Sequence, residues 1–168
     1  MIYKWQIGKW RFTFTVAPTT EVTGVNSTLK DGNHILMWDF DDKTLDQVRY
    51  SLKIVQDQYK LPNIYICNTG KENHYNAYCF FRVPWQLAME IVVSTPNVDL
   101  QFFKYSVYRE HFTLRISEKE GRDWRLVDVL KGRGTGNVAL SELESFTKYQ
   151  TILDEHQSKV KWLWGKEK

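Results

Sequence analysis

The sequence predicts an α+β protein built on a split β-α-β core. This prediction rests on the order in which strand-like and helix-like apolar patterns follow one another along the chain. Strand character appears in three runs, at residues 34–41, 64–67 and 75–83. Between the first two, apolar side chains recur every three or four residues over 44–60, which predicts an amphipathic helix packed on a sheet. Pro84 then precedes a second expected helix at 85–94, in a position that a first helical turn tolerates.

A further strand is expected at residues 111–117, where apolar Phe112, Leu114 and Ile116 alternate with polar residues. The resulting order of strand, helix, strand, strand, helix, strand is typical of the ferredoxin-like or RNA-recognition-motif-like (RRM-like) arrangement. Such a sheet carries its helices on one face and leaves the other face open. This core is expected to span residues 33–119.

The flanking segments are expected to complete one domain covering residues 1–168. Alternation over 1–17, with Gly8 and Lys9 near the turn, predicts an N-terminal hairpin, and polar residues predict a loop up to residue 32. Residues 124–130 have strand character. A last helix is expected at 140–160, because Ser141 and Glu144 have the spacing of a capping box.

Bulk properties limit the classes of protein that the chain can belong to. A chain of 168 residues is the size of one domain, and its net charge of +3 permits a polyanionic partner without requiring one. Cys67 and Cys79 both fall in apolar runs, where cysteine usually behaves as a small buried hydrophobe, and no zinc spacing is present. No stretch has the length to cross a bilayer. We therefore expect a protein without a membrane partner, located in the cytoplasm, or in the host cytoplasm if a mobile element encodes it.

Asp39 and Asp41 are the leading candidates for chemistry. They end an apolar strand, and because side chains alternate along a strand, both should point to the same side. Two like charges held together favour a compensating cation, and hard carboxylate oxygens suit Mg²⁺ or Mn²⁺. The alternative is an ordinary turn at the end of a strand, which Asp42 and Thr44 fit well as capping residues.

Two further stretches could supply positive charge to a phosphate. In the first, Gly70 allows close backbone approach, Lys71 offers a point charge, and His74 begins a strand that should lie near Asp39. In the second, Arg115 lies within a strand and Lys119 follows it. A guanidinium there requires an anionic partner. Arg115 could pair with Asp39 or Asp41 structurally, or it could bind a triphosphate, and the residues alone favour neither interpretation.

The order of these stretches resembles the catalytic core of archaeo-eukaryotic primases, the primase-polymerase superfamily. The resemblance covers about residues 33–119 and rests on the order of four features. These are the Ile-Leu-Met-Trp-Asp-Phe-Asp run of 35–41, the glycine-containing loop of 70–74 that ends in histidine, an acidic residue after a helix, and the Leu-Arg-Ile strand of 114–116 followed by Lys119. It implies a template-directed nucleotidyl transferase, a minimal DNA primase that uses two divalent ions.

The resemblance also implies roles for individual residues. Asp39, Asp41 and Asp99 would be catalytic and hold Mg²⁺ or Mn²⁺. Asp99 is the choice for the third acid of the family pattern, and Glu110 fits that position less well. Residues that would bind the nucleoside triphosphate are Lys71, His74, Arg115 and Lys119. Candidates for holding a single-stranded DNA template are Lys104, Arg109, Lys131 and Arg133. A core without a helicase or zinc module would work with a separate helicase or other replication protein. Glu72 departs from the family, because a serine usually occupies this position.

Two other functions compete with this prediction. A catalytically inactive RRM-like protein could bind single-stranded nucleic acid by stacking bases on sheet aromatics, without metal and without a role for Asp39. A rolling-circle nuclease on a related fold would need paired metal-binding histidines and a tyrosine nucleophile. The chain has four histidines, at positions 34, 74, 111 and 156, and their scatter disfavours the nuclease.

Overall fold

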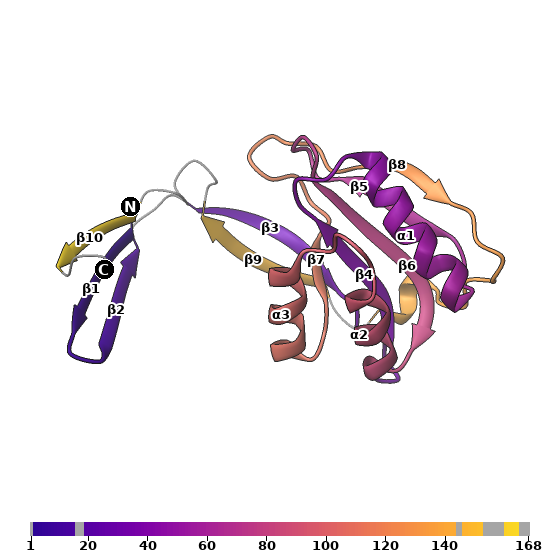
Figure 1. The fold of residues 1–168 in the computed structure, drawn as a ribbon, viewed down its shortest axis with the longest axis horizontal. Coiled ribbons are helices and arrows are strands. Elements are labelled where there is room, and N and C mark those ends of the chain that lie inside the picture. Colours follow the sequence, from indigo (N-terminus) through magenta and orange to yellow (C-terminus); the bar gives the residue numbers. More distant parts are fainter. Residues whose placement is uncertain (1, 16–18, 144–145, 153–159, 165–168) are drawn as a thin grey trace.

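The computed structural model describes residues 2–15, 19–143, 146–152 and 160–164. Within these residues the chain is α+β, with three α-helices and three sheets (Figure 1). The helices are α1 (Leu45–Tyr59), α2 (Trp85–Val93) and α3 (Leu100–Arg109), and Leu140–Glu142 form a 3-10 turn. The strands are β1 (Ile2–Ile7), β2 (Trp10–Thr15), β3 (Thr19–Asn26), β4 (His34–Phe40), β5 (Ile64–Asn68), β6 (Tyr75–Val83), β7 (Thr113–Arg115), β8 (Arg125–Leu130), β9 (Phe146–Ile152) and β10 (Val160–Trp164).

The central sheet has the strand order β4-β6-β5-β8, and all its pairs are antiparallel. Strands β4 and β5 therefore run in the same direction, with β6 between them and α1 connecting them. This is the split β-α-β connection that the sequence predicts. A second antiparallel sheet has the order β7-β3-β9, and a small sheet of β10-β1-β2 lies apart from both in Figure 1.

Local sequence explains how α1 is placed against this sheet. The helix begins with a capping box, in which the Thr44 hydroxyl accepts from the Gln47 amide and the Gln47 side chain accepts from the Thr44 amide. Its apolar stripe of Val48, Leu52 and Val55 is fully buried, as the periodicity predicts. The helix therefore leaves the end of β4 at a fixed angle, which positions the acidic residues just before it.

The fourth strand of the expected core pairs differently from the prediction. Strand β7 covers only Thr113–Arg115 and pairs with β3, where Gly24 faces Arg115, rather than with the free edge of β4. The ferredoxin-like position beside β4 is thus not filled by β7, and β8 extends the opposite edge beside β5. The reason is that β3 offers a long partner strand whose Val22 and Val25 are buried.

Two expectations about the flanking segments are wrong. Residues 19–26 form β3 rather than a loop, because the threonines that make this segment polar are also β-branched and suit a strand. The helix expected at 140–160 is also absent from the described residues of that segment. Only the short turn Leu140–Glu142 is helical, and the β-branched stretch that follows forms β9 against β3. Glu144 and residues 153–159 lie outside the described part of the chain.

Other expectations are confirmed. The N-terminal hairpin forms from β1 and β2, with Gly8 at a φ of +55° in its turn. Cys67 and Cys79 are buried and unpaired. Helix α3 is an element that the sequence patterns did not predict. No helix among the described residues combines the length and apolar character needed to span a membrane.

Candidate active site

A polar pocket of about 330 Å³ opens where β4 ends and β6 begins. Three regions that are distant in sequence meet there: the end of β4, the hairpin between β5 and β6, and strand β7 with the turn after it. The lining residues are Asp39, Asp41, Thr69, Lys71, His74, Asn76, Thr113, Leu114, Arg115, Lys119 and Arg122. The pocket thus brings together six of the seven residues expected to bind metal or nucleotide.

Asp39 lies on β4 and Asp41 directly follows Phe40, the last residue of that strand, so the two acids occupy alternate positions along the chain. Both line the pocket, as the period of a strand predicts. The chain turns sharply at Asp42, which has a φ of +55°, and Lys43 holds the turn by donating from its amide to the Asn73 carbonyl at 3.0 Å. The side chain of Asp41 is 50% exposed, so its carboxylate faces the open part of the pocket.

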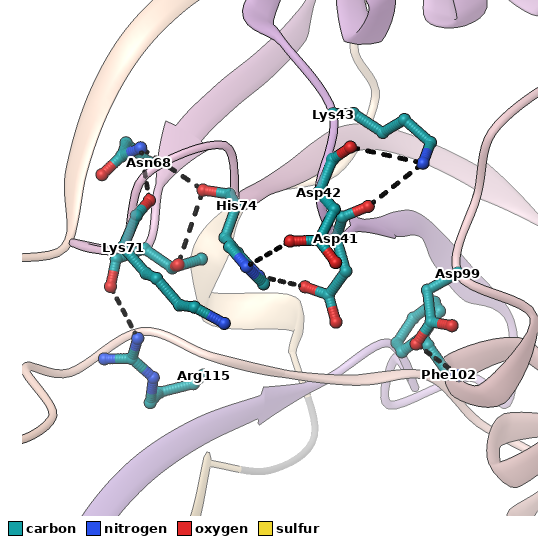
Figure 2. Close-up of polar contacts among 10 residues, drawn as sticks. Asp41, Asp42, Lys43, Asn68, Lys71, His74, Asp99, Phe102 and Arg115 are labelled. Atoms are coloured by element: carbon teal, nitrogen blue, oxygen red, sulfur yellow. Dashed lines mark hydrogen bonds and ion pairs between the residues drawn. The ribbon is translucent and has the colours of Figure 1, made fainter. Parts of the chain in front are cut away.

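His74 is the direct partner of the acidic residues. Figure 2 shows its ring facing Asp41 and Asp42: Nδ1 forms a short hydrogen bond with the Asp41 carboxylate, and Nε2 lies 3.4 Å from Asp42 Oδ1. With a relative exposure of 9%, His74 is held in place by the protein rather than projecting into solvent. Contact with Nδ1 leaves part of the Asp41 carboxylate available to a ligand.

The hairpin that carries His74 is closed by its own polar groups. The Thr69 amide donates to the His74 carbonyl at 3.1 Å, and Asn68 Nδ2 donates to the Lys71 carbonyl at 3.2 Å. Gly70 has a φ of +82°, and a Cβ there would lie 2.7 Å from the Arg122 side chain. The absence of a side chain at Gly70 therefore lets the 119–122 turn approach the hairpin closely.

Basic side chains face the acidic residues across the pocket. Arg115 Nη2 donates to the Thr69 carbonyl at 2.8 Å, and Nη1 donates to the Ser117 carbonyl through a short contact. These two bonds hold the guanidinium beside the hairpin, and its charge lowers the pKa of Asp39. A tight turn with positive φ at Glu120 and Gly121 presents Lys119 and Arg122 beside it. Glu120 pairs with both of them, at 3.9 Å from Lys119 Nζ and 3.0 Å from Arg122 Nη2, so it offsets part of the positive charge on this side of the pocket.

The surroundings of Asp39 disfavour the charged form of its carboxyl group. Burial, followed by the neighbouring charges of Asp41 and Asp99, raises the pKa of Asp39 to about 7, although Arg115 acts in the opposite direction. None of the ion pairs in the described part of the chain involves Asp39. A cation placed between Asp39 and Asp41 would relieve this repulsion.

The donor set fits a magnesium-type ion rather than a metal held by protein alone. The described residues contain no cluster of three or more acidic, histidine or cysteine side chains arranged to hold a metal. Mg²⁺, however, usually takes only one or two carboxylates and completes its coordination with water and substrate phosphates. Asp39 and Asp41 are two such carboxylates on one side of a pocket, and basic groups for phosphate lie opposite.

The third expected acid, Asp99, lies near this pair in a different role. Its carboxylate caps α3, with Oδ1 accepting from the Gln101 amide at 2.9 Å and Oδ2 accepting from the Phe102 amide at 3.0 Å. Its own amide donates to the Asp39 carbonyl at 2.8 Å. Figure 2 places Asp99 on the side of Asp41 opposite His74. Asp99 therefore acts on Asp39 electrostatically and through the backbone.

The residues expected to hold nucleic acid are divided between two places. Lys104 and Arg109 lie on α3, and Arg109 lines a smaller pocket that also includes Asp39. Lys131 and Arg133 follow β8 at the far end of the sheet, where Arg133 lines a separate pocket with Lys53 and Lys60 of the α1 region. The structure does not bring this second pair near Asp39.

Five residues of the pocket were not among the candidate site residues from the sequence: Thr69, Asn76, Thr113, Leu114 and Arg122. Asn76 Nδ2 donates to the Arg115 carbonyl at 3.3 Å and so fixes β7 against β6. Arg122 lines the pocket because its turn packs closely against Gly70. The sequence around Arg122 gives no indication of this contact. Glu72, the departure from the primase pattern, is exposed and lies outside the pocket lining.

Comparison of the chain with protein-family models, with curated proteins and with solved structures finds no match. The class of the site therefore has to be argued from its own geometry. That geometry is a solvent-open pocket lined by two carboxylates, Asp39 and Asp41, and by four basic side chains, Lys71, Arg115, Lys119 and Arg122.

Proposed function

We propose that this protein is a metal-dependent nucleotidyl transferase of the primase-polymerase type, acting on nucleoside triphosphates and a single-stranded DNA template. The observation that carries the proposal is the single pocket in which Asp39 and Asp41 face four basic side chains. This arrangement separates a place for a divalent cation from a place for the phosphates. The split β-α-β connection and the order of the motifs along the chain also support it.

Each group has a role that its chemistry supports. A divalent ion held by Asp39 and Asp41 would supply charge neutralisation at the reacting phosphate. Lys71, Arg115 and Lys119 bind and orient the β- and γ-phosphates, with Arg115 held in place by its bonds to backbone carbonyls. His74 fixes the Asp41 carboxylate through Nδ1. Positioning and charge stabilisation of this kind account for most catalysis in phosphoryl transfer.

The inactive RRM-like alternative needs exposed aromatic rings on the open face of the sheet. Tyr65, Tyr78 and Phe80 do occupy that face, but they line a largely apolar cavity with Leu143 and Ile116. Tyr78 is only 5% exposed. The structure therefore favours the charged pocket over the aromatic face as the place where a ligand binds.

The deciding experiment is nucleotide incorporation on a single-stranded template, with and without a primer, in Mg²⁺ or Mn²⁺. The variant Asp39→Asn/Asp41→Asn should lower incorporation by about a hundredfold or more, because it removes the charges that hold the cation. Asp46→Asn is the matched control, since Asp46 is an exposed acid in the first turn of α1 and lies outside the pocket.

Undiminished synthesis by the double variant would refute the proposal. If the wild-type protein makes no product but binds single strands in a salt-sensitive and metal-independent way, the inactive alternative is correct.

A further inference from the structure

Helix α3 presents an exposed aromatic and basic stripe beside Asp39 that the proposed chemistry has not used. Tyr105 and Tyr108 are 62% and 88% exposed, and only Ser106 of the helix is buried. Gln101, Tyr105 and Tyr108 are spaced by four and three residues, so they share one face of the helix. Arg109 lies over the Tyr105 ring, with its guanidinium carbon 6.0 Å from the ring centroid.

This stripe borders a pocket of about 260 Å³ that adjoins the candidate active site. The pocket is lined by Asp39, Asp99, Gln101, Phe102, Tyr105, Ser106, Arg109 and Thr113. Asp39 and Thr113 line both pockets and therefore form the boundary between them. Figure 2 shows Asp99 and Phe102 on one side of Asp41, and His74, Lys71 and Arg115 on the other.

The helix is fixed firmly enough to serve as a binding surface. Phe102 stacks on buried Phe112 at a centroid distance of 5.5 Å. The Asp99 amide ties the start of the helix to the Asp39 carbonyl. The position of Tyr105 and Arg109 relative to Asp39 is therefore set by the core.

We propose that this stripe of α3 binds the 3′ end of the nucleic-acid strand that accepts the nucleotide, and delivers its 3′-hydroxyl to Asp39. The inference rests on the proposed function. Nucleotidyl transfer displaces pyrophosphate in line, so the acceptor oxygen enters from the side opposite the leaving group. The basic residues that would hold the leaving phosphates lie in one pocket, and α3 lies across Asp39 from them.

The side chains of the stripe match a single strand in two ways. Tyrosine rings stack on bases without regard to sequence, and Lys104 and Arg109 supply charges for the phosphate backbone. In the transfer step, the 3′-hydroxyl oxygen bonds to the α-phosphorus of the triphosphate. The bond from that phosphorus to the oxygen bridging to the β-phosphate breaks, pyrophosphate leaves, and the hydroxyl proton passes to solvent.

The test uses the full chain and short oligodeoxynucleotides. Tyr105→Ala/Tyr108→Ala should weaken binding of a fluorescent single strand by at least about fivefold, because base stacking is lost. Arg109→Lys keeps the charge but loses the planar contact with Tyr105, so a smaller loss is expected. Tyr50→Ala is the matched control, since Tyr50 is 69% exposed on α1 and lies outside both pockets.

A photoactivatable thymine analogue then locates the strand end. An analogue at the 3′ terminus of a 12-mer should cross-link to α3, and an analogue at the 5′ terminus should not. The α3 variants and the Tyr50→Ala control should all be stabilised by Mn²⁺ and nucleoside triphosphate to the same extent as the wild type. Primer extension that proceeds normally in Tyr105→Ala/Tyr108→Ala, with unchanged strand affinity, would overturn the inference while leaving the proposed function in place. Cross-linking to α3 with undiminished synthesis by Asp39→Asn/Asp41→Asn would support the strand-binding surface and refute the proposed catalytic role of the acids.

Discussion

One face of the central sheet is apolar in its middle and charged at one end, and the change takes place within a few residues of the same strands. On β4, Ile35 lines an apolar cavity of about 390 Å³, whereas Asp39 lines the polar pocket. On β6, Tyr78 belongs to the cavity and Asn76 to the pocket. The two regions therefore have different roles. The apolar middle of the sheet face stabilises the fold, whereas the end of the face holds the polar and charged side chains of the pocket, which lower stability.

Strand β4 also carries a titratable group near each of its ends, His34 and Asp39, and burial shifts the pKa of both. His34 at the start is 5% exposed, and its Nδ1 forms a hydrogen bond of 2.9 Å with Ser27 Oγ. The Trp85 ring packs against it in a tilted arrangement, with the ring centroids 4.9 Å apart. Burial, and then the charge of His111, lower the pKa of His34. Burial raises the pKa of Asp39 at the other end. Both groups are thus driven towards their neutral forms.

The largest effect is expected in the apolar middle. Ile35→Ala should lower the free energy of unfolding by about 2–5 kcal/mol, because Ile35 is fully buried and the loss enlarges a cavity. Urea denaturation measures this loss. Under conditions where the variant is folded, stabilisation by Mn²⁺ should equal that of the wild type. A variant that lost only the Mn²⁺ effect would erase the distinction between the two regions.

A smaller effect is expected from pH at the start of β4. Because the pKa of His34 is lower in the folded protein than its ordinary value of 6.5, the unfolded chain binds the proton first as pH falls. Stability should therefore decline below about pH 6.5, by at most about 1.4 kcal/mol per pH unit, until the folded-state pKa is passed. His34→Asn should flatten this part of a melting-temperature profile, and His111→Asn should alter it only slightly. An equally steep profile in His34→Asn would assign the pH dependence to another group.

The smallest effect is expected at the acidic end, with the opposite sign. The pKa of Asp39 is about 7 in the folded protein against 3.8 for an ordinary aspartate, so the folded state retains a proton that the unfolded chain has lost. Stability from this group is present below about pH 4 and is lost as pH rises through 7. Without metal at pH 8, the free energy of unfolding of Asp39→Asn should exceed that of the wild type by about 1 kcal/mol. This value is smaller than the full pKa difference would give, because solvent in the pocket screens the charge.

With divalent metal present, the wild type should become more stable than Asp39→Asn. Mn²⁺ is expected to raise the melting temperature of the wild type and to leave that of Asp39→Asn nearly unchanged, because only the wild type keeps both carboxylates. Equal shifts in the two proteins would show that Asp39 does not contribute to a metal site.

The amino-acid sequence alone determined helix α1, the strands around it, and the placement of Asp39 and Asp41 on the same side of the extended chain. Helix periodicity placed α1, strand alternation oriented the two acids, and the glycine-containing hairpin predicted the position of His74. These features depend on interactions between residues that are close in the chain. Periodicity and turn chemistry therefore suffice to predict them.

Tertiary structure decided which strand pairs with which, and therefore what faces the acids. The polar, threonine-rich segment of residues 19–26 became β3 because a partner strand was available on each side, and the expected last helix gave way to β9. Arg122 entered the pocket through contact with Gly70, and α3 came to border Asp39 through one backbone hydrogen bond. Such long-range pairings depend on the free energy of the whole assembly, which no local pattern encodes.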